Sequence, residues 1–434
     1  MSSGPSRTVE NAVCTFCGCT CDDITLVTRG GRIVEARRAC EAGRAWFESR
    51  SDTPEVEAYV DGRPASAGDA IEVAARFLAG ARAPLVYGLV EASGAAQGAA
   101  VELADLLGAA LDTPSSGSHG AWLAAFQRRG NRSATLAEVR NRADLVVLWE
   151  TAPERSHPRF LERFVEPGGL YVVGQRVIVA MGEPRAPTSS HANRAFSVPE
   201  GRAVETLWAL RAIVRGRPLG AEVERMTGVP RDRLEEWANA LAGCRYGAWV
   251  YDADSAVEPA LAEAVFAVVE ALDEKAPFAA LGLRGRGNPA GAESVVTSRT
   301  GYPFAVDFRR GYPRFEPGRS TTDLLASGAF DAALLLGCDA QEALPERARR
   351  ALASIPTAIV DFRQSEIARR VRAAIFTATY GVSAPATVAR MDGIALRARP
   401  ALESALPSDA AVLRQLLDRV AALRGKLRGK GSAS

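Results

Sequence analysis

Four cysteines near the N-terminus have the spacing of a metal site. Cys14, Cys17 and Cys21 follow the pattern C-x2-C-x3-C, and Cys40 comes after eighteen further residues. Thiolates are the ligands that soft metal centres select, so the set fits an iron–sulfur cluster or zinc and excludes a hard cation. Because structural zinc sites usually combine two close pairs, the spacing favours a [4Fe–4S] cluster. Zinc, and a vestigial site of reduced thiols, stay open as alternatives.

The segment that leads to the fourth cysteine predicts a two-stranded ribbon. Its sequence is ITLVTRGGRIVEA, and Gly30-Gly31 supplies the hairpin turn. Such a ribbon would bring Cys40 to the far side of whatever the first three thiols bind. The other cysteines, Cys19, Cys244 and Cys338, lie in a loop or in apolar strand-like contexts, and we expect them to be small buried side chains.

Composition describes a globular protein of more than one domain. The chain has 434 residues, 47% hydrophobic and 24% charged, so two to three domains are expected. Its net charge of +2 provides no bulk attraction to nucleic acid or to a membrane surface. No signal peptide precedes the cysteines, and no apolar run reaches the roughly 18 residues that span a bilayer. The sequence therefore predicts a cytoplasmic location, in agreement with cysteines spaced for metal rather than for disulfides.

Helical segments alternate with short apolar runs, which is the pattern of a doubly wound parallel sheet. After a hairpin turn at Asp61-Gly62, helices are predicted over roughly 66–80, 93–108, 198–214 and 256–272. Strands are predicted over 85–89, 143–150, 170–173 and 245–252, and within 326–339 and 355–364.

The predicted fold class is α/β, with a Cys-rich ribbon subdomain and two doubly wound domains around a central cleft. The subdomain takes residues 1–60, and the first α/β domain takes 61–244, with 350–396 returning to it. The second α/β domain is 245–349, and 397–434 form a C-terminal helix and a disordered basic tail, LRGKLRGKGSAS. Ligands of open α/β sheets bind at the carboxyl ends of strands. The loops after residues 88, 112, 149, 174, 282, 337 and 361 are therefore expected to line the cleft.

Several stretches together resemble the B subunit of formylmethanofuran dehydrogenase, a family of the molybdopterin oxidoreductase superfamily. The resemblance runs from Val13 to about Leu396. It is carried by CTFCGCTCDDI at the cysteines, SSGSHG, WETAPERSHPRF and, most specifically, TGYPFAVDFRRGYPRFEPG at 300–318.

The resemblance implies what the redox-active relatives contain. In them one fold holds a [4Fe–4S] cluster beside a tungsten or molybdenum ion that two pterin dinucleotides chelate. A cysteine or selenocysteine, commonly followed by His-Gly, is a ligand of that ion. Here Ser118 stands at the ligand position and is followed by His119. Serine alone does not exclude a metal, because some members of the superfamily use a serine alkoxide.

Four departures from the family pattern fall on the expected pterin site. Glu150 stands where redox relatives have glycine in Gly-x-Asn-Pro, and a carboxylate there would repel a phosphate by about 1–4 kcal/mol at 4 Å. The loops at Gly174 and Gly337 lack the usual acidic residue with proline, and Cys40 is not followed by the x-Lys-Gly of many pterin enzymes. We therefore expect molybdopterin and tungstopterin to be absent, and expect Ser118, Glu150 and Gly337 to face one cleft.

With the redox ligands substituted, the chain resembles the B subunit of a formyltransferase/hydrolase complex that serves one-carbon metabolism in methylotrophic bacteria. That resemblance implies a non-redox scaffold for an amidohydrolase-like hydrolytic subunit, a formyltransferase subunit and a C subunit. A formyl carrier of the methanofuran type would be handled through those partners. The alternatives are a tungsten or molybdenum formylmethanofuran dehydrogenase with Ser118 on the metal, and an electron-transfer subunit that uses only the iron–sulfur cluster.

Other candidate residues have simpler interpretations. No Gly-x-Ser-x-Gly elbow surrounds Ser118, and zinc bound by histidine would need all of His119, His157 and His191. The aromatic and arginine residues from Tyr302 to Arg319 fit either a rigid packing loop that anchors a partner or a ligand box. The sequence assigns no catalytic residue to this chain.

Overall fold

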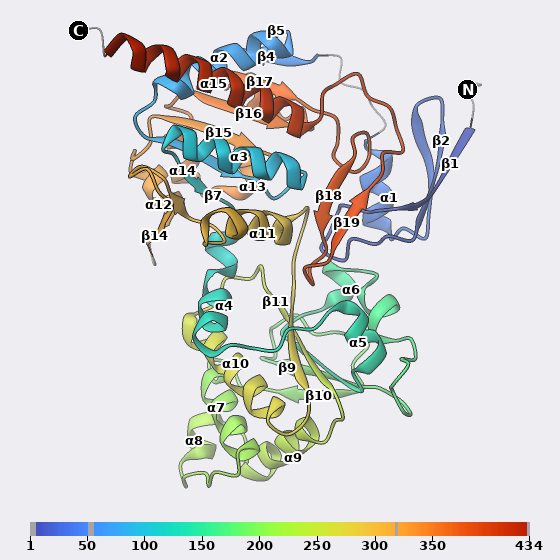
Figure 1. Cartoon of the computed structure of the whole chain (residues 1–434). Helices are drawn as coiled ribbons and strands as arrows, with labels where there is room; N and C mark the ends of the chain where they lie inside the picture. Colours follow the sequence, from blue (N-terminus) through green and yellow to red (C-terminus); the bar gives the residue numbers. More distant parts are fainter. Residues whose placement is uncertain (1–5, 51–55, 317–319, 432–434) are drawn as a thin grey trace. The chain divides into compact units, whose positions relative to one another are not determined.

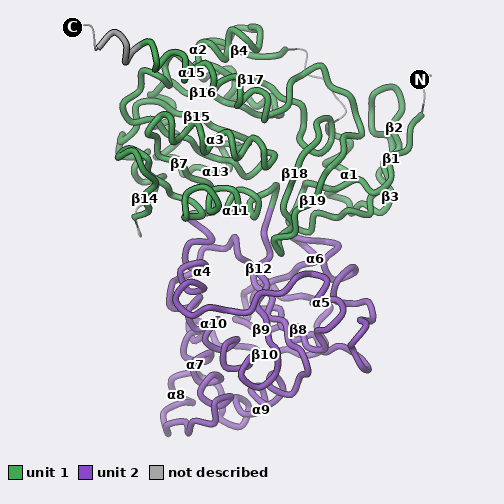
Figure 2. Tube along the Cα trace, viewed as in Figure 1, with its two compact units in different colours: residues 1–116, 286–434 green, residues 117–285 purple. Residues whose placement is uncertain are grey.

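The computed structural model describes residues 6–50, 56–316 and 320–431. These residues form two compact units: unit 1 lies within 1–116 and 286–434, and unit 2 is 117–285 (Figure 2). Each unit contains a parallel sheet with helices packed on it, as the alternation of helices and apolar runs predicts.

Unit 1 is built on a sheet of nine strands within the described residues (Figure 1). The central strands run parallel in the order β7, β6, β15, β16, β17. Short antiparallel strands extend both edges. In chain order the strands are β4 (Ala58–Val60), β5 (Arg63–Ala65), β6 (Pro84–Gly88), β7 (Ala110–Asp112), β13 (Val306–Asp307), β14 (Arg314–Phe315), β15 (Ala332–Leu336), β16 (Thr357–Asp361) and β17 (Ala373–Phe376).

Helices cover both faces of this sheet because alternate strand residues point to opposite faces. Val86 and Leu334 pack with α2 (Ala67–Gly80), α3 (Gly94–Leu107) and α15 (Asp409–Gly431). Leu85 and Leu335 pack on the other face, with α12 (Thr321–Ala326) and α14 (Glu346–Leu352). The remaining elements of this part are α11 (Pro289–Thr300), α13 (Ala340–Ala343) and η2 (Glu366–Arg369).

The N-terminal ribbon is confirmed and has one more strand than predicted. β2 (Ile24–Arg29) and β3 (Arg32–Arg37) form the expected antiparallel hairpin, and β1 (Ser6–Ala12) pairs with β2. Gly30 and Gly31 have φ of 56° and 77°, the left-handed conformation that a tight hairpin turn requires. The rest of unit 1 is α1 (Glu41–Glu48) and the hairpin of β18 (Ala386–Ala389) and β19 (Ala395–Ala398).

Unit 2 has a fully parallel sheet in the order β10, β9, β8, β11, β12. Its strands are β8 (Leu145–Trp149), β9 (Val177–Gly182), β10 (Arg194–Ser197), β11 (Gly247–Asp252) and β12 (Phe278–Leu283). Its helices are α4 (Ser115–Arg129), α5 (Leu136–Arg142), α6 (Pro153–Ser156), the π-helical turn η1 (Leu161–Val165), α7 (Ala203–Val214), α8 (Val223–Thr227), α9 (Arg231–Ala242) and α10 (Pro259–Asp273).

The domain boundary predicted between residues 244 and 245 differs from the observed units. β8 and β11 pair in parallel, with Leu145 opposite Gly247, so both sides of that boundary belong to one sheet. Sequence order alone cannot show this pairing, because the connection between the two strands also contains β9, β10 and several helices. The segment 350–396 supplies β16 and β17 to the sheet of unit 1.

The strand predicted over 170–173 is wrong. Leu170, Tyr171 and Val173 lie in a turn and are 78%, 67% and 77% exposed. The turn is held by the buried guanidinium of Arg176, which donates to the carbonyls of Arg140, Ala143 and Pro167 at 2.7, 2.6 and 3.1 Å. The strand beside β8 is the next apolar run, β9.

The disordered tail is also contradicted from residue 423 to 431. α15 continues to Gly431, and Leu423 packs against the core of unit 1. The guanidinium of Arg424 donates to the carbonyl oxygens of Leu106 and Leu107, where α3 ends and its last carbonyls lack helical partners. None of the helices in the described part of the chain is both long and apolar enough to cross a bilayer.

Candidate functional site

The first three candidate metal ligands lie on one tightly closed loop. The backbone N–H of Cys14 donates to the carbonyl of Cys21 at 2.8 Å, and the Thr20 N–H donates to the carbonyl of Cys17 at 3.0 Å. Thr20 has a φ of 41°, a conformation that non-glycine residues rarely adopt. Cys14, Cys17 and Cys21 are buried. The short spacing is therefore used to wrap three thiols around one loop.

The fourth thiol joins them at the start of α1. Cys40 is the N-cap, and its sulfur accepts the Gly43 N–H at 3.3 Å. A Cβ on Gly43 would lie 3.4 Å from both the Cys14 and the Cys40 sulfur, so these two sulfurs lie against the same glycine. Burial raises the pKa of Cys14, and the neighbouring Cys17, Cys21 and Cys40 thiols raise it further. Cys14 therefore lies within electrostatic reach of the other three thiols.

The donor set fits a thiolate-bound cluster in ligand type, and three of its four thiols are buried. Cys14, Cys17, Cys21 and Cys40 would hold such a cluster, and its chemistry would be electron storage or structural support. Among the residues that the structure describes, no group of three or more His, Cys, Asp or Glu side chains is arranged to hold a metal ion. Binding of a cluster therefore stays a prediction.

Replacement of one candidate cysteine ligand tests whether the site binds a cluster. Anaerobically purified protein is expected to show broad visible absorption from an iron–sulfur cluster, and Cys17→Ala is expected to lose it. Cys19→Ala is the matched control, because Cys19 lies in the same loop but outside the ligand spacing. A colourless wild-type protein, or absorption that survives in Cys17→Ala, would contradict cluster binding and favour the vestigial site.

Ser118 and His119 lie in the first turns of α4, beside a partly buried polar cluster of unit 2. The guanidinium of Arg284 contacts His119 Nδ1 at 3.0 Å and Asp254 Oδ1 at 3.0 Å. Because a guanidinium can only donate, Nδ1 accepts, and the neutral ring carries its proton on Nε2. The Arg284 carbonyl in turn accepts from His157 Nε2 at 2.7 Å. His119 is thereby presented as a fixed N–H donor.

Sequence reasoning missed Asp254 and Arg284. Both follow adjacent strands, β11 and β12, whose carboxyl ends meet at one edge of the sheet. The signal that could have found them is a charged residue within two positions of the end of a buried strand. His191, the third histidine, pairs instead with Glu166 at 2.7 Å.

Glu150 fills the end of β8 with its own side chain. It has a φ of 47°, and its Oε1 accepts the Glu183 N–H at 3.2 Å. A Cβ on Gly182, at the end of the neighbouring strand β9, would lie 2.3 Å from Glu150 Cγ. Burial raises the pKa of Glu150. The side chain therefore covers the space that a glycine at 150 would leave open.

Gly174 has no comparable close contact with a neighbouring strand or loop. It lies in the exposed turn with a φ of 78°, and a Cβ added there would meet no atom within 4 Å. Its glycine is explained by the left-handed backbone of the turn alone.

Gly337 lies at the switch point of the sheet of unit 1. β6 and β15 are neighbours there, while β7 and β16 continue to opposite sides. A Cβ on Gly337 would lie 2.3 Å from the Glu91 carbonyl, and one on Gly88 would lie 2.4 Å from the Leu336 carbonyl. Glycine is required at both positions because the two loops cross at backbone contact.

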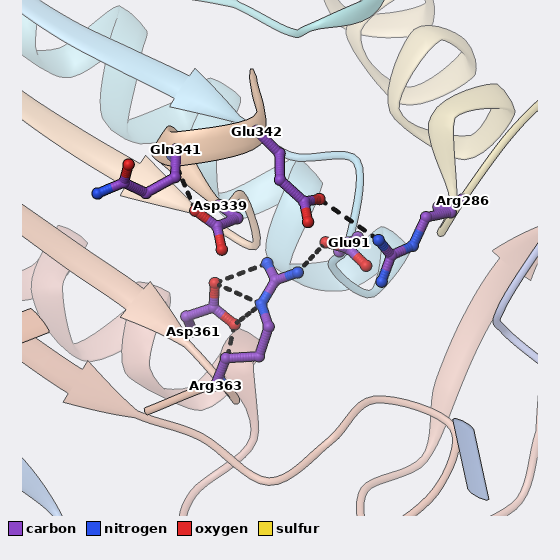
Figure 3. A network of polar contacts seen from close by, with 7 residues as sticks. All are labelled: Glu91, Arg286, Asp339, Gln341, Glu342, Asp361 and Arg363. Carbon is purple, nitrogen blue, oxygen red and sulfur yellow. Dashed lines mark hydrogen bonds and ion pairs between the residues drawn. The ribbon is translucent and has the colours of Figure 1, made fainter. Parts of the chain in front are cut away.

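Charged side chains lie at the ends of the strands around Gly337 (Figure 3). Arg363 pairs with Glu91 and, at 2.8 Å, with Asp361, and the three side chains are only 18%, 10% and 5% exposed. Burial raises the pKa of Glu91, although Arg363 acts in the opposite direction. Nearby, Arg286 pairs with Glu342 at 3.3 Å. We refer to Glu91, Asp361 and Arg363 as the switch-point triad.

The predicted site residues thus divide between the units. Ser118, His119, Glu150 and Gly174 belong to unit 2, whereas Gly337 and the four cysteines belong to unit 1. The expectation that Ser118, Glu150 and Gly337 face one cleft stays a prediction.

Comparison with known proteins identifies the family. No family model matches the chain. The B subunit of the tungsten-containing formylmethanofuran dehydrogenase 2 of Methanocaldococcus jannaschii is 31% identical over 95% of this chain and 99% of that protein. The chain belongs to the formylmethanofuran dehydrogenase B-subunit family. The corresponding protein of Methanococcus maripaludis is 30% identical over 95% of this chain and 98% of its own length.

A relative of the formyltransferase/hydrolase type is also similar. The B subunit of the formyltransferase/hydrolase complex Fhc of Methylorubrum extorquens is 30% identical over 65% of this chain and 74% of that protein. A chain in the crystal structure of that complex with methylofuran superposes with a TM-score of 0.71 at 26% identity, covering 84% of this chain and 99% of that chain.

The fold is that of the molybdopterin oxidoreductases. Acetylene hydratase of Pelobacter acetylenicus superposes with a TM-score of 0.69 over 95% of this chain and 69% of that chain. At 12% identity this likeness concerns the fold alone.

The described part, 300–316, of the stretch most typical of the family forms part of the sheet edge of unit 1. β13 pairs with β7, and the Ala305 N–H donates to the Asp112 carboxylate at 2.9 Å. The rings of Tyr302 and Phe315 stack 5.7 Å apart, whereas Tyr312 is 53% exposed. Pro317, Gly318 and Arg319, the last residues of the expected partner-binding stretch, lie outside the described residues. The role of the stretch in binding a partner stays a prediction.

Proposed function

We propose that this chain is the non-redox B subunit of a formyltransferase/hydrolase complex. In that complex it scaffolds hydrolysis of a formyl carrier of the methanofuran type to formate. Its partners would be an amidohydrolase-like hydrolytic subunit, a formyltransferase subunit and a C subunit. The likeness to the B subunit of the Methylorubrum extorquens complex supports this assignment.

Glu150 is the observation that carries the proposal. Its side chain packs over Gly182 at the strand ends. The family resemblance implies that redox relatives bring a pterin diphosphate to this loop. A phosphate at such a position would meet both a steric block and a carboxylate, with a repulsion of about 1–4 kcal/mol at 4 Å. The presence of Ser118 at the position of the metal-binding cysteine also argues against a redox metal site.

A second candidate is a tungsten or molybdenum formylmethanofuran dehydrogenase with Ser118 as a metal ligand. The two tungsten-containing relatives, which match over 95% of the chain, favour it. The Asp254–Arg284–His119 arrangement beside Ser118 is compatible with it. A protein that transfers electrons through the cysteine site alone is a third candidate.

Dye reduction separates the proposed function from the second candidate. The chain, purified from cells grown with molybdate and tungstate, is expected not to reduce artificial electron acceptors with formate or a formyl carrier. The reason is that the scaffold has exchanged its metal-binding cysteine and closed its phosphate site. Dye reduction that depends on molybdate or tungstate in the growth medium would overturn the proposal in favour of the second candidate.

A further inference from the structure

Several buried hydrogen-bond donors in unit 1 have no partner among the described residues, and four of them lie near the cysteine loop. They are Thr15 Oγ1, Trp46 Nε1, Arg50 Nε and Tyr380 Oη. Thr15, Trp46 and Tyr380 are 2%, 4% and 1% exposed. Each unsatisfied polar group of this kind costs about 1–3 kcal/mol, so native proteins retain few without a reason. We refer to these four groups as the donor cluster.

Ring contacts bring the donor cluster together. The guanidinium of Arg50 lies 4.4 Å from the centre of the Trp46 ring and 4.7 Å from that of the Phe362 ring. The Phe362 ring is 5.9 Å from the Tyr380 ring. Thr15 lies against the residue that follows Tyr380, because a Cβ on Gly381 would be 2.9 Å from Thr15 Cγ2. The four donors therefore share one region beside the cysteine loop.

Among the described residues, the carboxylates near the donor cluster are bonded to another arginine and not to Arg50. The nearby carboxylates of Glu91 and Asp361 are both bonded to Arg363. No ion pair to Arg50 occurs within the described ranges, and burial lowers the pKa of its guanidinium. A half-buried guanidinium without an anion is unfavourable. What the described residues do not supply is an acceptor for the Arg50 Nε–H group.

Shape restricts which anion fits. The rings of Trp46 and Phe362 cover Arg50, so its N–H edge is what a ligand can reach. A guanidinium edge matches the two oxygens of a planar carboxylate. Indole and guanidinium groups only donate, and hydroxyl groups can donate, so all four members suit an acceptor. The adjacent Glu91 and Asp361 repel a dianion more strongly than a monoanion, which disfavours phosphate.

We propose that the donor cluster is a binding site for a small monocarboxylate of the size of formate. The choice of formate rests on the proposed function, in which formate is the product. The site would hold the carboxylate between the cysteine loop and the switch-point triad. It takes no part in a bond-breaking step.

Formate binding to the full-length chain tests this. Titration with sodium formate at constant ionic strength, followed by calorimetry and by thermal unfolding, is expected to show saturable binding. In Arg50→Gln and in Tyr380→Phe the affinity should fall at least about tenfold, since each loses a donor that contacts the anion. Arg44→Gln is the matched control, because Arg44 is an exposed arginine of α1, the helix that ends two residues before Arg50. Its affinity should equal that of the wild type.

The other outcomes are equally informative. Absence of formate binding by the wild type, or equal binding by all three variants, would overturn the site. Tighter binding of inorganic phosphate than of formate would overturn the monocarboxylate assignment. Circular dichroism shows whether Arg50→Gln is folded, and Tyr380→Phe removes only one oxygen, so a loss in both cannot come from misfolding alone. Because no carrier is hydrolysed in this titration, its failure leaves the proposed function untouched, and a redox-active chain could still bind formate.

Discussion

Replacement of Arg363 by methionine is expected to lower the free energy of unfolding of unit 1 by about 3–5 kcal/mol, because it leaves two buried carboxylates without their counterion. Glu91 and Asp361 are 10% and 5% exposed and both bind Arg363. The comparison of denaturant midpoints with the wild type measures the loss. Arg370→Met is the matched control, since Arg370 pairs with Glu366 at 3.6 Å with side chains 73% and 90% exposed. Its effect should stay within about 0.5 kcal/mol.

The pH dependence of this loss has a defined sign. Burial already raises the pKa of Glu91, and removal of Arg363 takes away the group that opposes this shift. A carboxyl whose folded-state pKa is raised destabilises the fold only when it ionises. The deficit of Arg363→Met should therefore be small below the unfolded-state pKa and grow as the pH rises through the folded-state pKa. Glu91→Gln in the same chain should restore part of the stability, and an equal deficit at all pH values would contradict the argument.

Omission of this chain from the complex is expected to reduce hydrolysis of the formyl carrier to the background rate. A scaffold acts by holding its partners, and obligate interfaces typically bury more than about 2,000 Å². Formate release by the partner subunits alone, and after addition of separately purified chain, measures the effect. Ser118→Ala should restore the activity as fully as the wild type, because the proposal gives Ser118 no catalytic role. Full hydrolysis without the chain would contradict a scaffolding function.

The sequence predicted the elements that rest on local patterns. The Gly30-Gly31 hairpin, and the strands β6 and β8, follow from turn residues and from short apolar runs bounded by polar segments. Cysteine spacing located the cysteine loop, and Gly337 was singled out by comparison with the loops of the family. These features depend on residues that are close together in the chain or on motifs of fixed spacing.

Long-range contacts account for what was missed. The run that contains Leu170 and Val173 is apolar enough for a strand, but Arg176 holds it in a turn by bonds to Arg140 and Ala143. The switch-point triad joins residue 91 to residues 361 and 363. No local pattern reports which arginine meets which carboxylate across such a separation. The domain boundary at 244 was misplaced for the same reason. β8 and β11 pair although about 100 residues separate them in the sequence, and a local pattern cannot show that pairing.

The metal content of the purified complex tests the central claim most directly. Elemental analysis by mass spectrometry, per copy of this chain, is expected to find neither molybdenum nor tungsten, even after growth with both. Iron in the preparation would report on the cysteine site and leave the non-redox assignment in place as long as the chain reduces no dye. Molybdenum or tungsten at one ion per chain would contradict the account and make the protein a formylmethanofuran dehydrogenase.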